Sequence, residues 1–224
     1  MRRPRTSGVA RIVVLIGGTC AEMARWLKSL AADVVLWIDV QSELEKVKAA
    51  PGVIRLVLAP GQTLDSLFEG VPESKYLEKI REFLKSRPGV DLLMGLGQAR
   101  FAGLRAAEML VATPEFRAVL QNIFSTVMII HNGTIEKVEI EQFSSGCGGT
   151  GGPSGGPIVA ELAKYYREHH RAVVHVRFNR AGSLSFEGLG DAVHDNNACG
   201  TTPGRWESRS CPSTSRRRSG RWAA

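Results

Sequence analysis

The chain has 224 residues, of which 43% are hydrophobic and 23% charged, as is typical of a globular protein that buries one core. Its formal charge of +7 is confined to the ends, because residues 1–11 carry four arginines and residues 201–224 carry a net charge of +5, which leaves the rest slightly acidic. A nucleic-acid backbone requires basic residues on a folded face, so this distribution argues against nucleic acid as a partner.

Strands and helices are expected to alternate along the first part of the chain. Short, nearly continuous apolar runs predict buried strands at residues 11–16, 34–38 and 53–58. Helical spacing predicts helices at residues 20–31, 42–50 and 75–86, and prolines and glycines predict a long loop at residues 59–74. This alternation is typical of an α/β fold with a Rossmann-like, mostly parallel sheet and helices on both faces.

The second part of the chain continues the pattern. A strand is expected at residues 90–94, helices at residues 102–111 and 115–124, and another strand at residues 173–178. Asn132-Gly133 lies between the apolar runs 127–130 and 135–140, which predicts a β-hairpin. Pro157 is suited to the first turn of a helix, so a helix is predicted to begin there.

Three glycine-bearing segments each follow a predicted strand and precede a predicted helix. They are Gly17-Gly18-Thr19, Gly95-Leu96-Gly97-Gln98 and the stretch from Gly146 to Gly156, in which seven of eleven residues are glycine. In a parallel sheet all three lie at the carboxyl edge, where such folds bind ligands. Glycine lets backbone N–H groups approach an anion, and a following helix N-terminus attracts negative charge. The three loops therefore predict a di- or triphosphate site.

These segments carry a resemblance to a known family. Gly148-Gly149-Thr150-Gly151-Gly152, with the helix after it, is similar to the GGGTGTG loop of the tubulin/FtsZ GTPase superfamily. Gly95-Leu96-Gly97 resembles that family's γ-phosphate loop, and Gly17-Gly18 resembles its first glycine loop. Phe186-Glu187-Gly188 looks like the motif whose glutamate approaches the ribose. The motifs occur in the family's order, and divergent bacterial tubulin-like proteins are the nearer comparison.

The resemblance implies a protein that binds GTP or GDP, with room for Mg²⁺, and that associates head to tail with itself or with a full-length tubulin-like partner. Because the family's catalytic acidic loop would lie beyond the end of this sequence, we expect weak or no hydrolysis and assign no catalytic residue. The residues that the resemblance assigns to nucleotide binding are Gly17, Gly18, Thr19, Gly95, Leu96, Gly97, Gln98, Gly148, Gly149, Thr150, Gly151, Gly152 and Glu187.

The expected organisation is a basic extension at residues 1–10, a nucleotide-binding domain at residues 11–190 and a disordered basic tail at residues 191–224, which lacks any apolar pattern.

No run approaches the roughly 18 apolar residues that span a membrane. The four cysteines form neither a CxxC pair nor a metal spacing. This cysteine usage favours a reducing compartment, so the predicted location is the cytoplasm.

Two alternatives stay open. In a Rossmann-type NAD(P) domain, Gly17-Gly18 would lie under the pyrophosphate and Asp39 would bind the ribose hydroxyls, but Gly146 to Gly156 would have no role. The second alternative is a non-catalytic module that binds a partner and keeps the shape of a nucleotide site. A P-loop NTPase is excluded, since no glycine loop ends in Gly-Lys-Ser or Gly-Lys-Thr.

Overall fold

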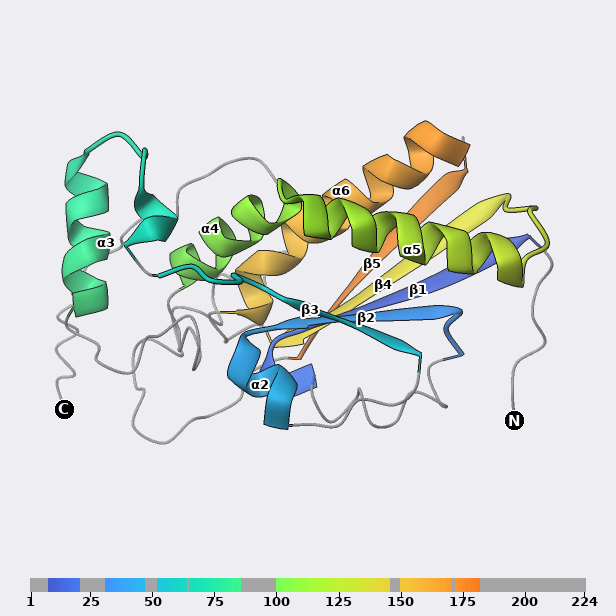
Figure 1. The fold of residues 1–224 in the computed structure, drawn as a ribbon, viewed down its shortest axis with the longest axis horizontal. Coiled ribbons are helices and arrows are strands. Elements are labelled where there is room, and N and C mark those ends of the chain that lie inside the picture. The colour runs from blue at the N-terminus through green and yellow to red at the C-terminus, as the bar shows by residue number, and fades with distance from the viewer. Residues whose placement is uncertain are drawn as a thin grey trace, which may run out of the picture.

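The computed structural model describes residues 8–20, 31–46, 52–63, 65–85, 100–145, 150–170 and 172–181. A five-stranded sheet in the order β3-β2-β1-β4-β5 forms its centre, and every neighbouring pair of strands is parallel (Figure 1). The strands are β1 (Val9–Ile16), β2 (Val34–Asp39), β3 (Val53–Val57), β4 (Lys137–Ser145) and β5 (Val173–Ala181). The predicted Rossmann-like α/β class is confirmed.

Helices lie on both faces of this sheet (Figure 1). They are α2 (Gln41–Lys46), α3 (Lys75–Lys85), α4 (Arg100–Val111), α5 (Pro114–Ile130), α6 (Gly151–His170) and the short 3₁₀ helices η1 (Gly18–Cys20) and η3 (Ser66–Phe68). The strands predicted at residues 11–16, 34–38, 53–58 and 173–178 and the helices predicted at residues 75–86, 102–111 and 115–124 are present with shifted ends. The helix predicted at residues 42–50 is present as α2 up to Lys46, where the described residues end. The strand at residues 90–94, the tail at residues 191–224 and most of the helix predicted at residues 20–31 lie outside the described residues.

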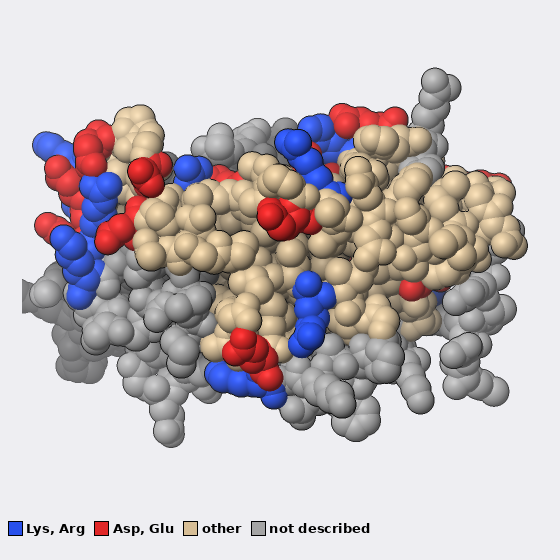
Figure 2. All heavy atoms as spheres, in the orientation of Figure 1, with Lys and Arg blue, Asp and Glu red and all other residues tan. Residues whose placement is uncertain are grey.

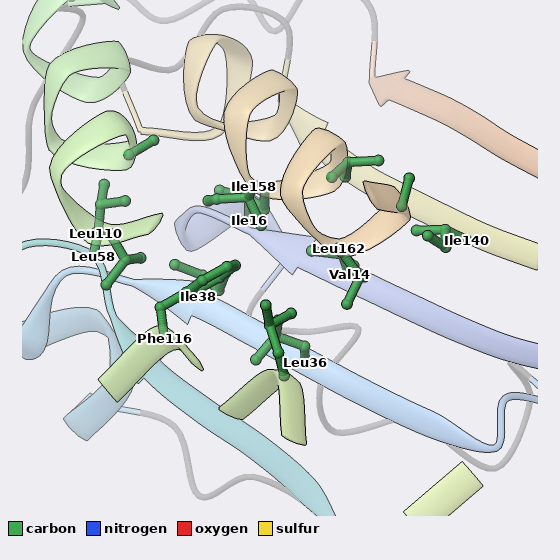
Figure 3. Packing of buried hydrophobic residues seen from close by; sticks show 14 of the residues in the cluster. Val14, Ile16, Leu36, Ile38, Leu58, Leu110, Phe116, Ile140, Ile158 and Leu162 are labelled. Carbon is green, nitrogen blue, oxygen red and sulfur yellow. The ribbon is translucent and has the colours of Figure 1, made fainter. Parts of the chain in front are cut away.

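The core is divided by the sheet into two layers. On one face, Val14 and Ile16 of β1 lie close to Ile158 and Leu162 of α6 (Figure 3). On the other face, Leu15 and its neighbours on β2 pack with Leu44 of α2. Because β1 and β2 are buried on both faces, their sequences are nearly continuous apolar runs instead of alternating ones.

The hairpin predicted at Asn132-Gly133 is wrong, because residues 127–130 are the last turn of α5. Asn132 and Gly133 end this helix with positive φ angles of 52° and 80°, and the Gly133 amide donates a hydrogen bond of 2.8 Å to the carbonyl of Met128. Positive φ serves a helix C-terminus as well as a tight hairpin turn, so the dipeptide fits both. The strand that follows, β4, pairs in parallel with β1.

Helix α6 begins six residues before Pro157, where the sequence predicts its start. Residues 151–156 form the first turns, and the Ser154 hydroxyl donates a 2.9 Å hydrogen bond to a backbone carbonyl of α4. A Cβ atom at Gly155 would lie only 2.8 Å from the side-chain amide of Gln142 on β4. Small residues therefore let α6 approach both α4 and the sheet, and this packing outweighs the low helix propensity of glycine.

Candidate functional site

The carboxyl ends of β1 and β4 mark the switch point of the sheet. The chain continues from β1 to β2 on one side, whereas β4 lies on the other side of β1 (Figure 1). Open parallel sheets bind ligands in the crevice at such a point. Gly17 and Gly18 follow β1 here, and Thr150 and Gly151 lie at the start of α6, which follows β4.

The turn after β1 contacts the N-terminus of α6. Gly17 has a φ of +87°, and its amide donates a 3.0 Å hydrogen bond to the carbonyl of Ile38. A Cβ atom at Gly17 would lie 3.1 Å from the backbone nitrogen of Gly151 and 3.6 Å from Cβ of Thr150. Glycine is required at position 17 both by its φ angle and by this close approach.

Six of the predicted nucleotide-binding residues lie in these two segments. Gly17, Gly18 and Thr19 belong to the turn and 3₁₀ helix after β1, and Thr150, Gly151 and Gly152 belong to the start of α6. The structure thus brings the first and third glycine segments together. The predicted residues that lie outside the described ones are Gly95, Leu96, Gly97, Gln98, Gly148, Gly149 and Glu187.

Two polar side chains near the end of β4 were missed by the sequence interpretation. Gln142 and Ser144 are only 1% and 3% exposed, yet Gln142 Nε2 and Ser144 Oγ have no hydrogen-bond partner among the residues that the structure describes. Alternation along β4 places them on the same face as Val138 and Ile140, which is the face that α6 covers. Polar residues that continue an apolar alternation were the signal available in the sequence. Buried donors without partners are available to a ligand or to water.

Asp39, at the end of β2, is enclosed by the protein, with 1% of its surface exposed. Its Oδ1 accepts a 2.9 Å hydrogen bond from the amide of Val40. Burial raises the pKa of Asp39 from its ordinary value of 3.8 to about 7, and the nearby charge of Glu43 acts in the same direction. Its other oxygen, Oδ2, is buried and has no hydrogen-bond partner among the described residues, so burial does not distinguish Asp39 from Gln142 and Ser144 as a ligand group.

A carboxylate and a thiol also lie near the turn after β1. A Cβ atom at Gly18 would lie 3.2 Å from Oε2 of Glu43, whose other oxygen pairs with Lys46 Nζ at 2.6 Å. The Cys20 thiol donates to the carbonyl of Phe143 at 3.2 Å, and burial raises its pKa to about 11, so it is a neutral thiol. Within the described ranges no cluster of three or more His, Cys, Asp or Glu side chains is placed to hold a metal ion.

Charges on the face shown in Figure 2 are grouped by element. Acidic and basic side chains lie together on α3 and just before it, where Arg81 of α3 pairs with Glu73 at 2.6 Å. Helix α5, in contrast, carries no charge after Arg117. Because both signs are interspersed on α3, that part of the surface does not present a field of one sign to a polyanion.

We expect Gly17→Ala to destabilise the protein more than Gly52→Ala. Both glycines have a similar φ, +87° and +89°, so both substitutions introduce the same backbone strain of about 1–2 kcal/mol. A Cβ atom has nothing within 4 Å at Gly52, whereas at Gly17 it meets the backbone of α6 at 3.1 Å. That contact should add about 1–3 kcal/mol. Urea unfolding of the two variants measures the difference, and equal losses would contradict the tight approach.

The described part of the chain contains no helix with the length and apolar character needed to cross a membrane. No protein-family model matches the sequence, and neither does any curated protein.

Proposed function

We propose that the protein binds a guanine nucleotide, GTP or GDP, at the carboxyl ends of β1 and β4, as a tubulin/FtsZ-like protein of the cytoplasm. The observation that carries the proposal is the contact between Gly17 and Gly151, which joins the turn after β1 to the N-terminus of α6 at the switch point of the sheet. A glycine turn beside a helix N-terminus at the carboxyl edge of a parallel sheet suits a phosphate group.

The polar groups at this edge fit an anion better than a cation. Gln142 Nε2 and Ser144 Oγ are hydrogen-bond donors that have no partner in the described part of the chain, and phosphate oxygens are acceptors. A Mg²⁺ ion that accompanies the nucleotide would depend chiefly on phosphate oxygens and water, with Glu43 as a carboxylate beside Gly18. The site is thus suited to a nucleotide with its ion and not to a metal ion alone.

The guanine preference and the self-association rest on the family resemblance. They depend on the likeness of Gly95-Leu96-Gly97, Gly148 to Gly152 and Glu187 to the family's motifs, as given above. Head-to-tail association with further copies or with a tubulin-like partner belongs to the same proposal. It is independent of the contact between Gly17 and Gly151, so phosphate binding can be tested first.

Isothermal titration calorimetry with GTP, GDP, ATP and NAD, in the same buffer with Mg²⁺, tests the proposal. We expect GTP and GDP to bind and ATP and NAD to bind at least about tenfold more weakly, a difference of about 1.4 kcal/mol. Binding of NAD alone would favour the Rossmann alternative, in which Asp39 binds the ribose hydroxyls. Absence of binding by all four would overturn the proposal and favour the partner-binding module.

A matched pair of serine variants separates binding from folding. Ser144 Oγ has no partner within the described ranges, so Ser144→Ala should leave stability unchanged. It should weaken nucleotide binding by about three- to tenfold, the effect of one lost hydrogen bond. Ser154 Oγ donates to a carbonyl of α4, so Ser154→Ala should cost about 1 kcal/mol of stability and leave affinity unchanged. Equal nucleotide affinity in Ser144→Ala and the unmodified protein would remove Ser144 from the site.

A further inference from the structure

Strand β5 forms an open edge of the sheet within the described part of the chain. It pairs with β4 along its whole length, and the strand order ends with it. Of the large apolar side chains that are most exposed in the described residues, two lie on β5, namely Val173 at 59% and Phe178 at 42%. A long edge strand with exposed apolar side chains is a template for the addition of another strand.

The opposite edge, β3, differs in the features that favour strand addition. It has five residues against nine in β5, and its apolar side chains are all partly buried, whereas Val173 and Phe178 of β5 are exposed. A short edge strand offers few main-chain groups for the addition of another strand. Strand addition is therefore favoured at β5 over β3.

The charge of β5 selects among partner strands. His175 and Arg177 are exposed, and they lie beside Glu139 and Glu141 of β4 in the strand register. Arg177 Nη1 pairs with Glu141 at 3.2 Å, yet its side chain is still 73% exposed, so a second carboxylate can approach it from the outer side. β5 contains no acidic residue, so two copies of β5 would bring like charges together.

The other face of β5 is apolar, so a partner strand needs apolar residues on that face. Val174 and Val176 pack against the core beneath α6, and Phe178 lies on the same face by alternation. An added strand would continue this layer with its own apolar residues, while its alternate residues would lie next to His175 and Arg177.

We propose that the outer edge of β5 binds an extended segment of a partner protein in which apolar residues alternate with Asp or Glu. Main-chain hydrogen bonds to the outer edge of β5 would supply affinity, and the alternation of side chains would supply specificity. The surface lies along the edge strand, on the far side of β4 from β1. The inference therefore stands or falls independently of nucleotide binding.

The sequence of β4 provides a probe, because its acidic residues already match those of β5. We would measure, by fluorescence anisotropy, the binding of a labelled, end-capped peptide with the sequence of residues 137–145, KVEIEQFSS, and of a control peptide with both glutamates replaced by lysine. The acidic peptide should bind about tenfold more tightly, and its affinity should fall with rising salt. Amide exchange on binding should slow along β5 and not along β3.

Charge reversal on the protein completes the test. Arg177→Glu should abolish or invert the preference for the acidic peptide, whereas Arg167→Glu, the same change at an exposed position on α6, should leave it unchanged. Three results would each overturn the proposal. They are equal binding of the two peptides, absence of binding by both, and slowed amide exchange confined to strands other than β5.

Discussion

Replacing Asp33 with alanine is expected to lower the free energy of unfolding by about 2–6 kcal/mol, because each of two buried groups that lose their hydrogen-bond partner costs about 1–3 kcal/mol. Asp33 lies directly before β2, and its Oδ2 accepts a 2.9 Å hydrogen bond from the amide of Arg11 and lies 2.8 Å from Nε2 of His131. The side chains of His131 and Asp33 are only 6% and 7% exposed. Without the carboxylate, an imidazole and a backbone amide lose their acceptor in the interior.

Urea unfolding of two further variants controls this measurement. Asp33→Asn keeps an oxygen that accepts from the amide of Arg11, so its loss should be smaller than that of Asp33→Ala. Glu161→Ala removes a partner of Lys164 from a largely exposed pair on α6, and it should change stability by less than about 1 kcal/mol. A loss for Asp33→Ala as small as that for Glu161→Ala would contradict the stabilising role of the buried pair.

We expect Asp39→Asn to be more stable than the unmodified protein at pH 8 and nearly equal to it at pH 4. Burial raises the pKa of Asp39 to about 7, well above its ordinary value of 3.8. The folded protein therefore holds a proton that the unfolded chain releases in this range, and the resulting stabilisation is lost as the pH rises toward 7. At pH 8 the difference between the two proteins should reach up to roughly 4 kcal/mol.

Unfolding by urea at pH 4, 6 and 8 measures this dependence as the difference between variant and unmodified protein, so that other titrating groups cancel. Asp65→Asn serves as the control, because Asp65 is exposed and its side chain makes no capping hydrogen bond to η3. The change with pH should be larger for Asp39→Asn than for this control. A flat difference for Asp39→Asn would show that its carboxyl group is not held protonated by the fold.

The sheet could be predicted from sequence because its central strands are short apolar runs between turns. Residues 11–16 and 34–38 are buried on both faces, and this double burial produces the runs. The four apolar residues 127–130 formed a similar run, but they end a helix of 17 residues. A run of four apolar residues does not distinguish a strand from the buried end of a helix.

Sequence predicted only those parts of the candidate site that contain glycine-rich segments. Gly17 and Gly151 were expected at the carboxyl edge, and they do approach each other there. The sequence gives no sign that residues 151–156 are helical, since this depends on contacts of α6 with α4 and Gln142. The pairing of Asp33 with His131 likewise joins positions far apart in the chain, and local patterns carry no information about such contacts.

The position of β1 at the centre of the sheet has a consequence for synthesis. On one side Ile12 pairs with Val34, which follows soon after it, but on the other side Val9 pairs with Lys137. Closing so long a loop is entropically costly, and contacts of this kind form late and slowly. During translation, the main-chain groups along one edge of β1 thus stay unpaired until residue 145 has left the ribosome. Throughout that interval the nascent chain exposes the kind of strand edge that promotes aggregation and binds chaperones.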